Sequence, residues 1–119
     1  MEINQIPISI QNLRDHQLAD WYHERIEKHI NEFSNELTDE EDLSVTVILS
    51  DGTNIKATWF GYHNPNMITV EGVDGAGNKA KALLSHTNIQ ILLTKIKKIK
   101  DQKRTILGFQ QRETEPLKK

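Results

Sequence analysis

Residues 43–62 read Leu-Ser-Val-Thr-Val-Ile-Leu-Ser-Asp-Gly-Thr-Asn-Ile-Lys-Ala-Thr-Trp-Phe-Gly-Tyr, and this stretch decides the fold. In its first half, apolar residues alternate with serine and threonine, which predicts a strand with one buried face. Asp51-Gly52 then predicts a two-residue hairpin turn, because both residues tolerate positive φ. The chain is therefore expected to return along residues 53–62 as a second, antiparallel strand.

The strands expected after this turn are short. In the returning strand, apolar residues are predicted on two faces: Ile55, Ala57 and Trp59 on one, and Phe60 and Tyr62 on the other. A turn is expected at residues 64–66, because proline restricts φ and asparagine tolerates the left-handed region. Further strands are expected at residues 67–73, 79–85, 89–93 and 105–110, with a loop or a helical turn in the basic stretch before the last one.

Residues 15–37, before the hairpin, follow a helical period. Apolar side chains recur every three or four positions and form one stripe: Leu18, Tyr22, Ile26, Ile30, Phe33 and Leu37. Asn12 or Asp15 is the expected N-cap of this helix. The whole pattern predicts an α+β fold, in which an N-terminal amphipathic helix packs on a strongly bent, mainly antiparallel sheet of five to six strands.

Length and composition indicate one domain. The chain has 119 residues, of which 36% are hydrophobic and 27% charged, and this is enough for a core without cross-links. We expect an extended arm at residues 1–14, a single domain at residues 15–110 and a disordered tail at residues 111–119. Because the fraction of apolar residues is low, burial of apolar surface between subunits would add stability, which favours a homo-oligomer.

Targeting and redox signals are missing from the sequence. Without cysteine, disulfides and thiolate chemistry are excluded. No basic stretch precedes an apolar one at the N-terminus, so we expect no signal peptide. The apolar runs, such as residues 89–93, are too short to span a bilayer. We therefore expect a cytoplasmic protein with no membrane contact.

Charge is distributed unevenly, although the formal net charge is only -2. Acids dominate between Glu24 and Asp42, and bases dominate between Lys95 and Arg104. The basic stretch is the best electrostatic candidate for an anion or nucleic-acid surface. The pI of about 6.2 argues against a dedicated nucleic-acid domain. Because isoleucines interrupt the lysines, a half-buried element with a lysine-coated exterior is the favoured interpretation.

Three short motifs fail as catalytic or metal signatures. His23-Glu24 resembles the start of the HExxH motif of zinc proteases, but His29 lies on the opposite side of a helix, and both histidines are expected at the rim or in solvent. The glycines at positions 72, 75 and 77 lack a following helix, so a hairpin turn is favoured over a phosphate loop. No nucleophile elbow surrounds Ser85, which precedes His86. We therefore expect no enzyme activity, no metal and no cofactor.

Two breaks between strands carry the best candidates for binding. Residues 61–66 combine an aromatic ring, an imidazole and two amides, and residues 86–88 form the second break. If the sheet curls, the breaks meet at one rim that suits a nucleotide or a base. The alternative interpretation is turn chemistry with asparagine capping. We expect Tyr62 to stack, Arg104 to meet a phosphate, and polar groups to donate or accept hydrogen bonds, so the candidate ligand-binding residues are Tyr62, His63, Asn64, Asn66, His86, Asn88 and Arg104.

The chain also resembles a family of uncharacterised bacterial and prophage proteins, a domain of unknown function, over most of residues 19–109. The motifs that carry this resemblance are Ala19-Asp20-Trp21-Tyr22, Glu24-Arg25-Ile26, Gly61-Tyr62 with Pro65 and Met67-Ile68, and Arg104 with Ile106 and Gly108-Phe109. His63 stands where an aromatic residue is expected. The resemblance implies no known activity, but its prophage members imply a role such as sequestering a nucleotide signal used in host defence.

The order of elements is similar to that of the Sm-like (Hfq-type) barrel. A helix precedes five short strands, with a bend at Gly61-Tyr62-His63 and a break at His86. This resemblance implies a small barrel, Sm-like or SH3-like, that assembles as a ring and binds RNA at the loops between strands. His63 stands where the aspartate of the motif is expected, and no Arg-Gly pair occurs near Thr87-Asn88. The RNA-binding residues are therefore not carried over.

Three functions remain open. The leading hypothesis is a non-catalytic, oligomeric protein that binds a small nucleotide-type ligand at the two breaks. The second is an Sm-like RNA-binding module that uses residues 95–104, with an affinity that falls steeply with salt. The third is a protein–protein adaptor or inhibitor, in which Trp21, Tyr22 and Trp59 contribute to an interface.

Overall fold

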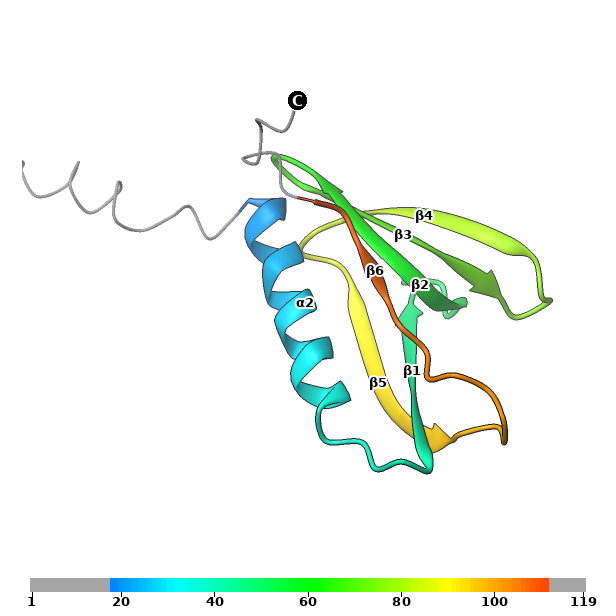
Figure 1. The fold of residues 1–119 in the computed structure, drawn as a ribbon. Coiled ribbons are helices and arrows are strands. Elements are labelled where there is room, and N and C mark those ends of the chain that lie inside the picture. The colour runs from blue at the N-terminus through cyan, green and yellow to red at the C-terminus, as the bar shows by residue number, and fades with distance from the viewer. Residues whose placement is uncertain (1–17, 112–119) are drawn as a thin grey trace, which may run out of the picture.

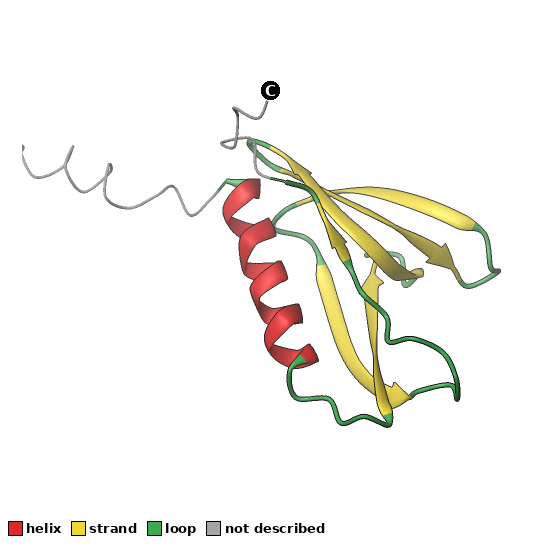
Figure 2. Cartoon of the chain, viewed as in Figure 1, coloured by secondary structure: helices red, strands yellow, loops and turns green. Residues whose placement is uncertain are grey.

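The structure, a computed structural model, describes residues 18–111. One helix, α2 (Ala19–Ser34), precedes six strands: β1 (Glu41–Ile48), β2 (Asn54–His63), β3 (Met67–Asp74), β4 (Lys79–Ser85), β5 (Gln90–Lys97) and β6 (Gly108–Phe109). The helix packs on a mostly antiparallel sheet, so the predicted α+β class is confirmed (Figures 1 and 2). The predicted arm at residues 1–14 and residues 112–119 of the predicted tail lie outside the described residues. The helix begins at Ala19 with Leu18 as its N-cap, so the predictions of a start at residue 15 and of Asn12 or Asp15 as the N-cap are wrong.

The sheet is open. Its strand order is β4-β3-β2-β1-β5, with antiparallel neighbours, and β6 pairs in parallel with β2. β1 and β5 pair along their whole length, from Glu41 opposite Lys97 to Ile48 opposite Gln90. Within the described residues, β4 and β5 are therefore the two edges of the sheet, although only residues 86–89 separate them in the chain.

Both predicted hairpins are present, but the first turn is not the two-residue turn that was predicted. Three residues, 50–52, separate Leu49 from its partner Thr53, and of Asp51 and Gly52 only the glycine has a positive φ. The turn between β1 and β2 has Gly52 at a φ of 91°, and the backbone N–H of Leu49 donates to the carbonyl oxygen of Thr53 across it, at 2.8 Å. In the loop between β3 and β4, Gly77 has a φ of 87°. These glycines supply the left-handed backbone that the turns require.

A β-bulge in β2 changes which face of the strand is buried. Ala57 lies opposite Gly72 and Trp59 lies opposite Glu71, so β2 has one residue more than β3 at this point. One extra residue shifts the alternation of side chains by one position. The prediction for the two faces of this strand is therefore wrong: Trp59 is only partly buried, and the buried set is Ile55, Ala57, Phe60 and Tyr62.

Beyond the bulge, β2 leaves β1 and pairs with β6. Its first residues lie opposite β1, whereas Trp59 and Phe60 lie opposite Gly108 and Phe109. The Trp59 ring covers Gly61 and Gly108, where a side chain would collide with it. The core fills the space between the bent sheet and the helix: Ala19, Ile30, Leu43, Val45, Val47, Ile55, Ala57, Phe60, Tyr62, Ile68, Val70 and Leu107.

The turn between β2 and β3 holds the N-terminal end of α2. The backbone N–H of Ala19 donates to the carbonyl oxygen of Pro65 at 2.8 Å, and that of Asp20 donates to Oδ1 of Asn64 at 2.9 Å. These contacts satisfy two of the N–H groups that a helix leaves unpaired at its start. The helix ends at Ser34, earlier than the predicted residue 37.

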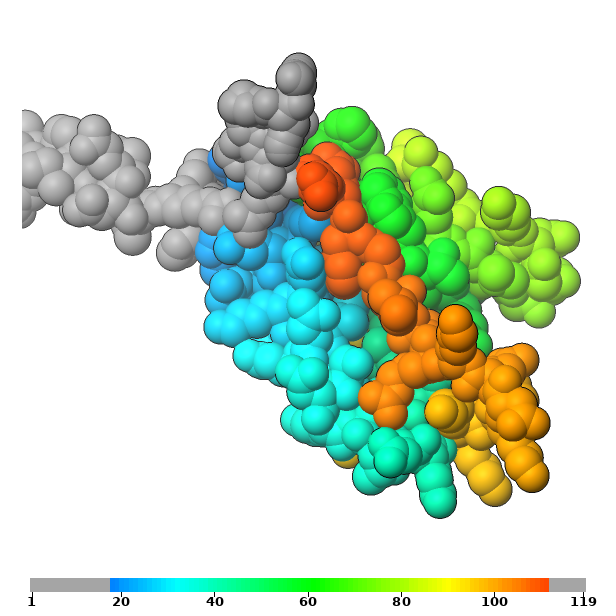
Figure 3. All heavy atoms as spheres, viewed as in Figure 1, coloured from blue at the N-terminus to red at the C-terminus, as the bar shows by residue number. Residues whose placement is uncertain are grey.

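The last two strands differ from their predictions. β5 continues to Lys97 rather than residue 93, because its pairing with β1 extends to Glu41. β6 is only Gly108–Phe109, because residues 105–107 are held by other contacts: the backbone N–H of Thr105 donates to Oδ1 of Asp42 at 2.9 Å. The segment that leads into β6 crosses the surface with α2 on one side and β2 on the other (Figure 3).

Candidate functional site

A groove lies between α2 and the chain that runs from the end of β4 into β5. Its volume is about 520 Å³. The lining side chains come from one face of the helix and from the linker and strand opposite: Tyr22, Arg25, Ile26, His29, Ile30, His86, Thr87, Ile89, Ile91 and Leu93. We call this feature the α2–β5 groove.

The floor of the α2–β5 groove is aliphatic. Ile89, Ile91 and Leu93 point toward the core but are only partly buried. The helix lies mainly against β2 and β3, so it covers β5 incompletely. Ile26 and Ile30 complete the floor from the helix. Such a floor can contact a flat ring or a hydrocarbon and exclude water from it.

Arg25 is the permanent cation of the groove. Its guanidinium carbon lies 5.5 Å from the centroid of the Trp21 ring, so the aromatic face supports the side chain. The Nε atom of Arg25 is buried and has no hydrogen-bond partner among residues 18–111. His29, one helical turn later, is exposed beside it. The terminal nitrogens of a guanidinium match a phosphate or a carboxylate.

His86 forms the polar wall of the groove near the start of α2. Its ring packs edge-on against Tyr22, with 4.8 Å between the ring centroids. The carbonyl oxygen of Asn66 lies 3.2 Å from Nδ1 of His86 and accepts the backbone N–H of the same histidine at 2.9 Å. If Nδ1 carries the proton and donates here, Nε2 is the ring atom left for a ligand. Thr87 adds a hydroxyl beside it.

The two predicted breaks do lie together at one rim. The hydrogen bonds between Asn66 and His86 join the turn at residues 64–66 to the linker at residues 86–89. The exposed polar residues at this rim are His63, Asn64, Asn66 and Asn88. His86 is the one predicted site residue that also lines the α2–β5 groove.

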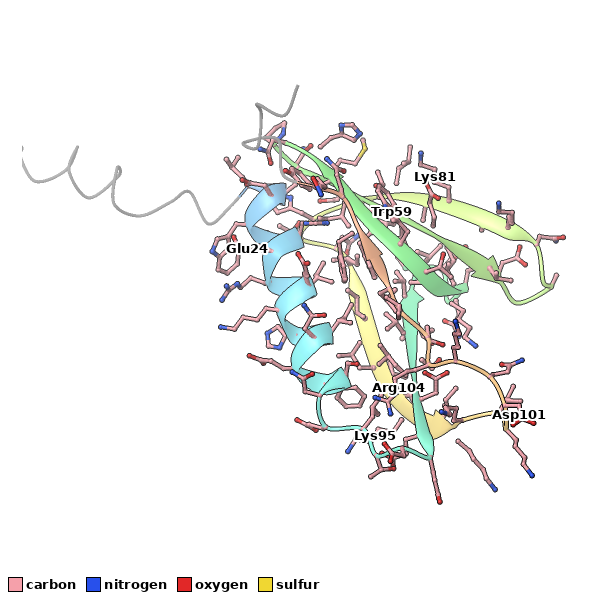
Figure 4. All side chains as sticks on the ribbon, viewed as in Figure 1. Glu24, Trp59, Lys81, Lys95, Asp101 and Arg104 are labelled. Atoms are coloured by element: carbon pink, nitrogen blue, oxygen red, sulfur yellow. The ribbon has the colours of Figure 1, made fainter. Side chains whose placement is uncertain are left out.

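Three of the predicted site residues make contacts within the protein itself. Tyr62 is 5% exposed, and its ring lies 4.8 Å from that of His23 in the core, so it is not placed to stack on a ligand. Asn64 caps α2, as the alternative interpretation of this turn predicted. Arg104 lies near the end of α2, far from the rim, and its Nη2 donates to the carbonyl oxygen of Thr38 at 2.7 Å (Figure 4).

The sequence pattern did not indicate Arg25 and His29 as site residues. They follow the stripe residues Tyr22 and Ile26 by three positions, which places them at the margin of the buried helix face. A cation at such a margin is a weak signal, because long charged side chains commonly cover apolar edges with their stems. Arg25 differs from other charged residues at the margin of the buried helix face because it lines the groove between α2 and β5.

The acidic and basic segments meet at one end of the molecule. Nζ of Lys95 lies 3.8 Å from Oε1 of Glu36, and Lys97 lies opposite Glu41 in the sheet. Figure 4 shows Lys95 and Asp101 at this end. Acidic groups interleaved with the lysines reduce the field that an anion would feel there.

Asp42 ties the segment after β5 to β1. Its Oδ1 accepts the backbone N–H groups of Leu43 at 2.7 Å and Thr105 at 2.9 Å, and its Oδ2 accepts the Thr105 hydroxyl at 2.9 Å. Burial alone would raise the pKa of Asp42, but these hydrogen bonds and the Arg104 cation outweigh burial and lower the pKa below its ordinary value of 3.8. Asp42 therefore serves the fold rather than a ligand.

The two helix histidines have different surroundings. His29 is exposed, as predicted, but His23 is 2% exposed, with Nε2 at 3.2 Å from the carbonyl oxygen of Phe60. The prediction for His23 is wrong because the bulged β2 brings a backbone carbonyl against the helix. Residues 18–111 contain no group of three or more His, Asp and Glu placed to hold a metal ion. No helix in this range is long and apolar enough to cross a membrane.

Comparisons with known proteins identify no relative of this chain. No protein-family model, curated protein or solved structure matches this chain. The resemblances to prophage proteins and to the Sm-like barrel therefore stay predictions.

Proposed function

We propose that this protein is a non-catalytic binding protein for a small nucleotide-type ligand, which it holds in the α2–β5 groove. The observation that carries the proposal is the combination of an aliphatic floor with the guanidinium-bearing side chain of Arg25 in the groove wall. A nucleotide offers the matching chemistry, because it joins a flat ring to an anionic phosphate. Among residues 18–111, the side chains that line the groove include no carboxylate, which favours binding over acid–base chemistry.

In the proposed complex, the base lies on the floor between Ile26 and Ile91, and the phosphate meets Arg25. His86 and Thr87 offer hydrogen bonds at the end of the groove near the rim. The exposed amides of the rim lie beyond His86, where a sugar or a second base would reach them. Binding without turnover suits the sequestration of a nucleotide signal, the role that the resemblance to prophage proteins implies.

A small barrel of the Sm-like or SH3-like type belongs to the same proposal. One helix, five antiparallel strands in the order β4-β3-β2-β1-β5 and a sharp bend in β2 support it. The sheet of the single chain is not closed, so a complete barrel wall requires a further strand at the open edges. An RNA-binding role has less support, because acidic residues accompany the lysines of residues 95–104.

Titration calorimetry with nucleoside monophosphates and cyclic dinucleotides tests the proposal. We expect binding by the wild type and a loss of about tenfold or more in affinity for Arg25→Ala, which removes the one arginine among the described residues that line the groove. Lys28→Ala is the matched control, since Lys28 is an exposed cation on the same helix and does not line the groove. Absence of binding for every nucleotide, with a folded protein, would refute the proposal.

A further inference from the structure

The two sides of the α2–β5 groove run in the same direction. Tyr22, near the start of α2, packs on His86 with 4.8 Å between the ring centroids. At the other end of the helix, Nζ of Lys95 lies 5.7 Å from the centroid of the Phe33 ring. The helix and β5 therefore lie side by side from start to end, as Figure 1 shows, and the groove between them is elongated.

The floor of the groove repeats at every second residue of the chain. Ile89, Ile91 and Leu93 pack against the core but are only partly buried. These three side chains cover about 13 Å, because a strand advances about 3.3 Å per residue. An apolar partner that excludes water from this surface would gain free energy. The matching partner is an extended segment with an apolar side chain at every second position.

Residues 3–13, which precede the described part of the chain, have this pattern, and we call them the isoleucine segment. Ile6, Ile8 and Ile10 alternate with a proline, a serine and a glutamine. In an extended segment these three isoleucines lie on one side and cover the same length of about 13 Å. Pro7 restricts the residue before it to extended conformations. The isoleucine segment carries no charge, so its burial costs no desolvation of an ion.

We propose that the isoleucine segment binds in the α2–β5 groove of its own molecule, with Ile6, Ile8 and Ile10 on the aliphatic floor. The carbonyl oxygen of Leu18 accepts the backbone N–H of Tyr22 at 3.4 Å, so residue 18 lies one helical turn from the His86 wall.

The connecting chain is long enough for this arrangement. The middle of the groove at Ile26 is about 12 Å from Leu18 along the helix, at about 1.5 Å per residue. Residues 11–17 span up to about 23 Å when extended. The chain can therefore reverse direction before Leu18 and enter the groove antiparallel to α2. A second copy of the chain is not needed to supply the segment.

Docking of the isoleucine segment has a consequence for the ligand, and this consequence rests on the proposed function. The segment covers the floor on which the base of a nucleotide would lie. A ligand binds only those molecules whose groove is open, so its apparent affinity is reduced by the open fraction. With about nine molecules in ten closed, affinity is about tenfold weaker than for an open groove. The segment is thus an internal competitor of the ligand.

Paramagnetic relaxation enhancement in NMR spectra tests the docking without any ligand. The chain contains no cysteine, so Ser9→Cys provides a single attachment point for a nitroxide, on the side of the segment that faces away from the floor. We expect strong broadening of the amide signals of Ile30 and Leu93, at the end of the groove remote from Leu18. Gly75, in the hairpin between β3 and β4 and far from β5, should be affected little (Figure 1).

Two variants of the labelled protein test whether the isoleucines hold the segment. Ile8→Asp combined with Ile10→Asp should abolish the broadening at the groove, because a carboxylate is costly on an apolar floor. Gln5→Asp combined with Gln11→Asp is the matched control, since it adds the same two charges on the opposite side of the segment and should leave the broadening unchanged. Equal broadening in the two variants would overturn the inference.

A mixed sample tests whether the segment comes from the same molecule. It contains isotope-labelled protein without nitroxide and nitroxide-labelled protein without isotope, so it reports contacts between copies alone. We expect no broadening of Ile30 or Leu93 in this sample. Broadening as strong as within one molecule would overturn the inference, because the segment would then bind a second copy.

Calorimetry of the same variants without nitroxide separates the competition from the proposed function. We expect a nucleotide to bind the Ile8→Asp and Ile10→Asp double variant about tenfold more tightly than the wild type, and to bind the control variant as the wild type does. Equal affinity for all three proteins would overturn the competition and leave the proposed function standing. Binding by none of them would refute the proposed function, while the relaxation data would still decide the docking.

Discussion

At the scale of single residues, hydrogen bonds to the Asp42 carboxylate hold a segment that was expected to pair as a strand. The sequence predicts a strand over residues 105–110, but only two of these residues pair with the sheet. Two hydrogen bonds from Thr105 to the Asp42 carboxylate hold the preceding chain instead. The lowered pKa of Asp42 follows from these bonds and from Arg104, which outweigh the effect of burial.

Replacement of Asp42 by alanine is expected to lower the free energy of unfolding by about 1–2 kcal/mol near neutral pH, because hydrogen bonds to a charged group are lost and the group is partly exposed. Urea unfolding monitored by circular dichroism measures this loss. Asp39→Ala, at an exposed carboxylate on the neighbouring loop, is the control and should change stability little.

The contribution of Asp42 to stability should also depend on pH. Because its pKa is lower in the folded than in the unfolded state, the carboxylate stabilises the fold at pH values above the unfolded pKa. This stabilisation is lost as pH falls through the folded pKa. The difference in stability between wild type and Asp42→Asn should therefore be constant above about pH 5 and shrink toward acid. A difference that stays constant down to strongly acidic pH would contradict this assignment.

At the scale of elements, the bend of the sheet depends on β2 and β3 together. The bulge adds a residue to β2, and Gly72 in β3 allows the two backbones to approach closely. A Cβ at position 72 would collide with the carbonyl oxygen of Lys56 and would lie 2.9 Å from Cα of Ala57. Both obstacles are backbone or close to it, so no side chain can move aside.

Gly72→Ala is expected to destabilise the protein by about 2 kcal/mol or more, because the strands must separate at the bend. Gly75→Ala is the matched control: a Cβ there meets nothing within 4 Å, so its effect should be small. Thermal unfolding of the two variants compares them directly. Equal melting temperatures would show that the bend tolerates a wider spacing of β2 and β3.

At the scale of the whole molecule, opposite charges gather at the same end. The acidic side chains of residues 36–42 lie beside the lysines at the end of β5, as the contact between Glu36 and Lys95 illustrates. Acids that lie beside the lysines weaken an anion-binding field, and a net charge of -2 gives no long-range attraction for a polyanion.

We therefore expect weak binding of single-stranded RNA at about 150 mM salt, where screening acts within about 8 Å. Fluorescence anisotropy with labelled RNA measures this affinity over a range of salt concentrations. The doubly substituted variant Lys97→Ala with Lys100→Ala should leave the weak affinity unchanged. Tight binding with a steep salt dependence that this variant abolishes would restore the RNA-binding hypothesis.

The sequence by itself determined the order and type of most elements. The helix, the first four strands and both glycine turns follow from patterns that neighbouring residues establish, namely a period of 3.6, a period of 2 and the need for positive φ at Gly52 and Gly77. The meeting of residues 64–66 with His86 also followed from the expectation of a curled sheet. The elements and the turns depend on local geometry, which consecutive residues determine.

Only the tertiary structure decided which side chains face the core and where a ligand would fit. The bulge moved Phe60 and Tyr62 to the buried face and removed Tyr62 from the candidate site. Arg25 became a site residue because α2 covers β2 and leaves β5 partly open. The physical reason is the same in each case: register and packing depend on contacts between segments far apart in the chain, and alternation within one segment carries no information about them.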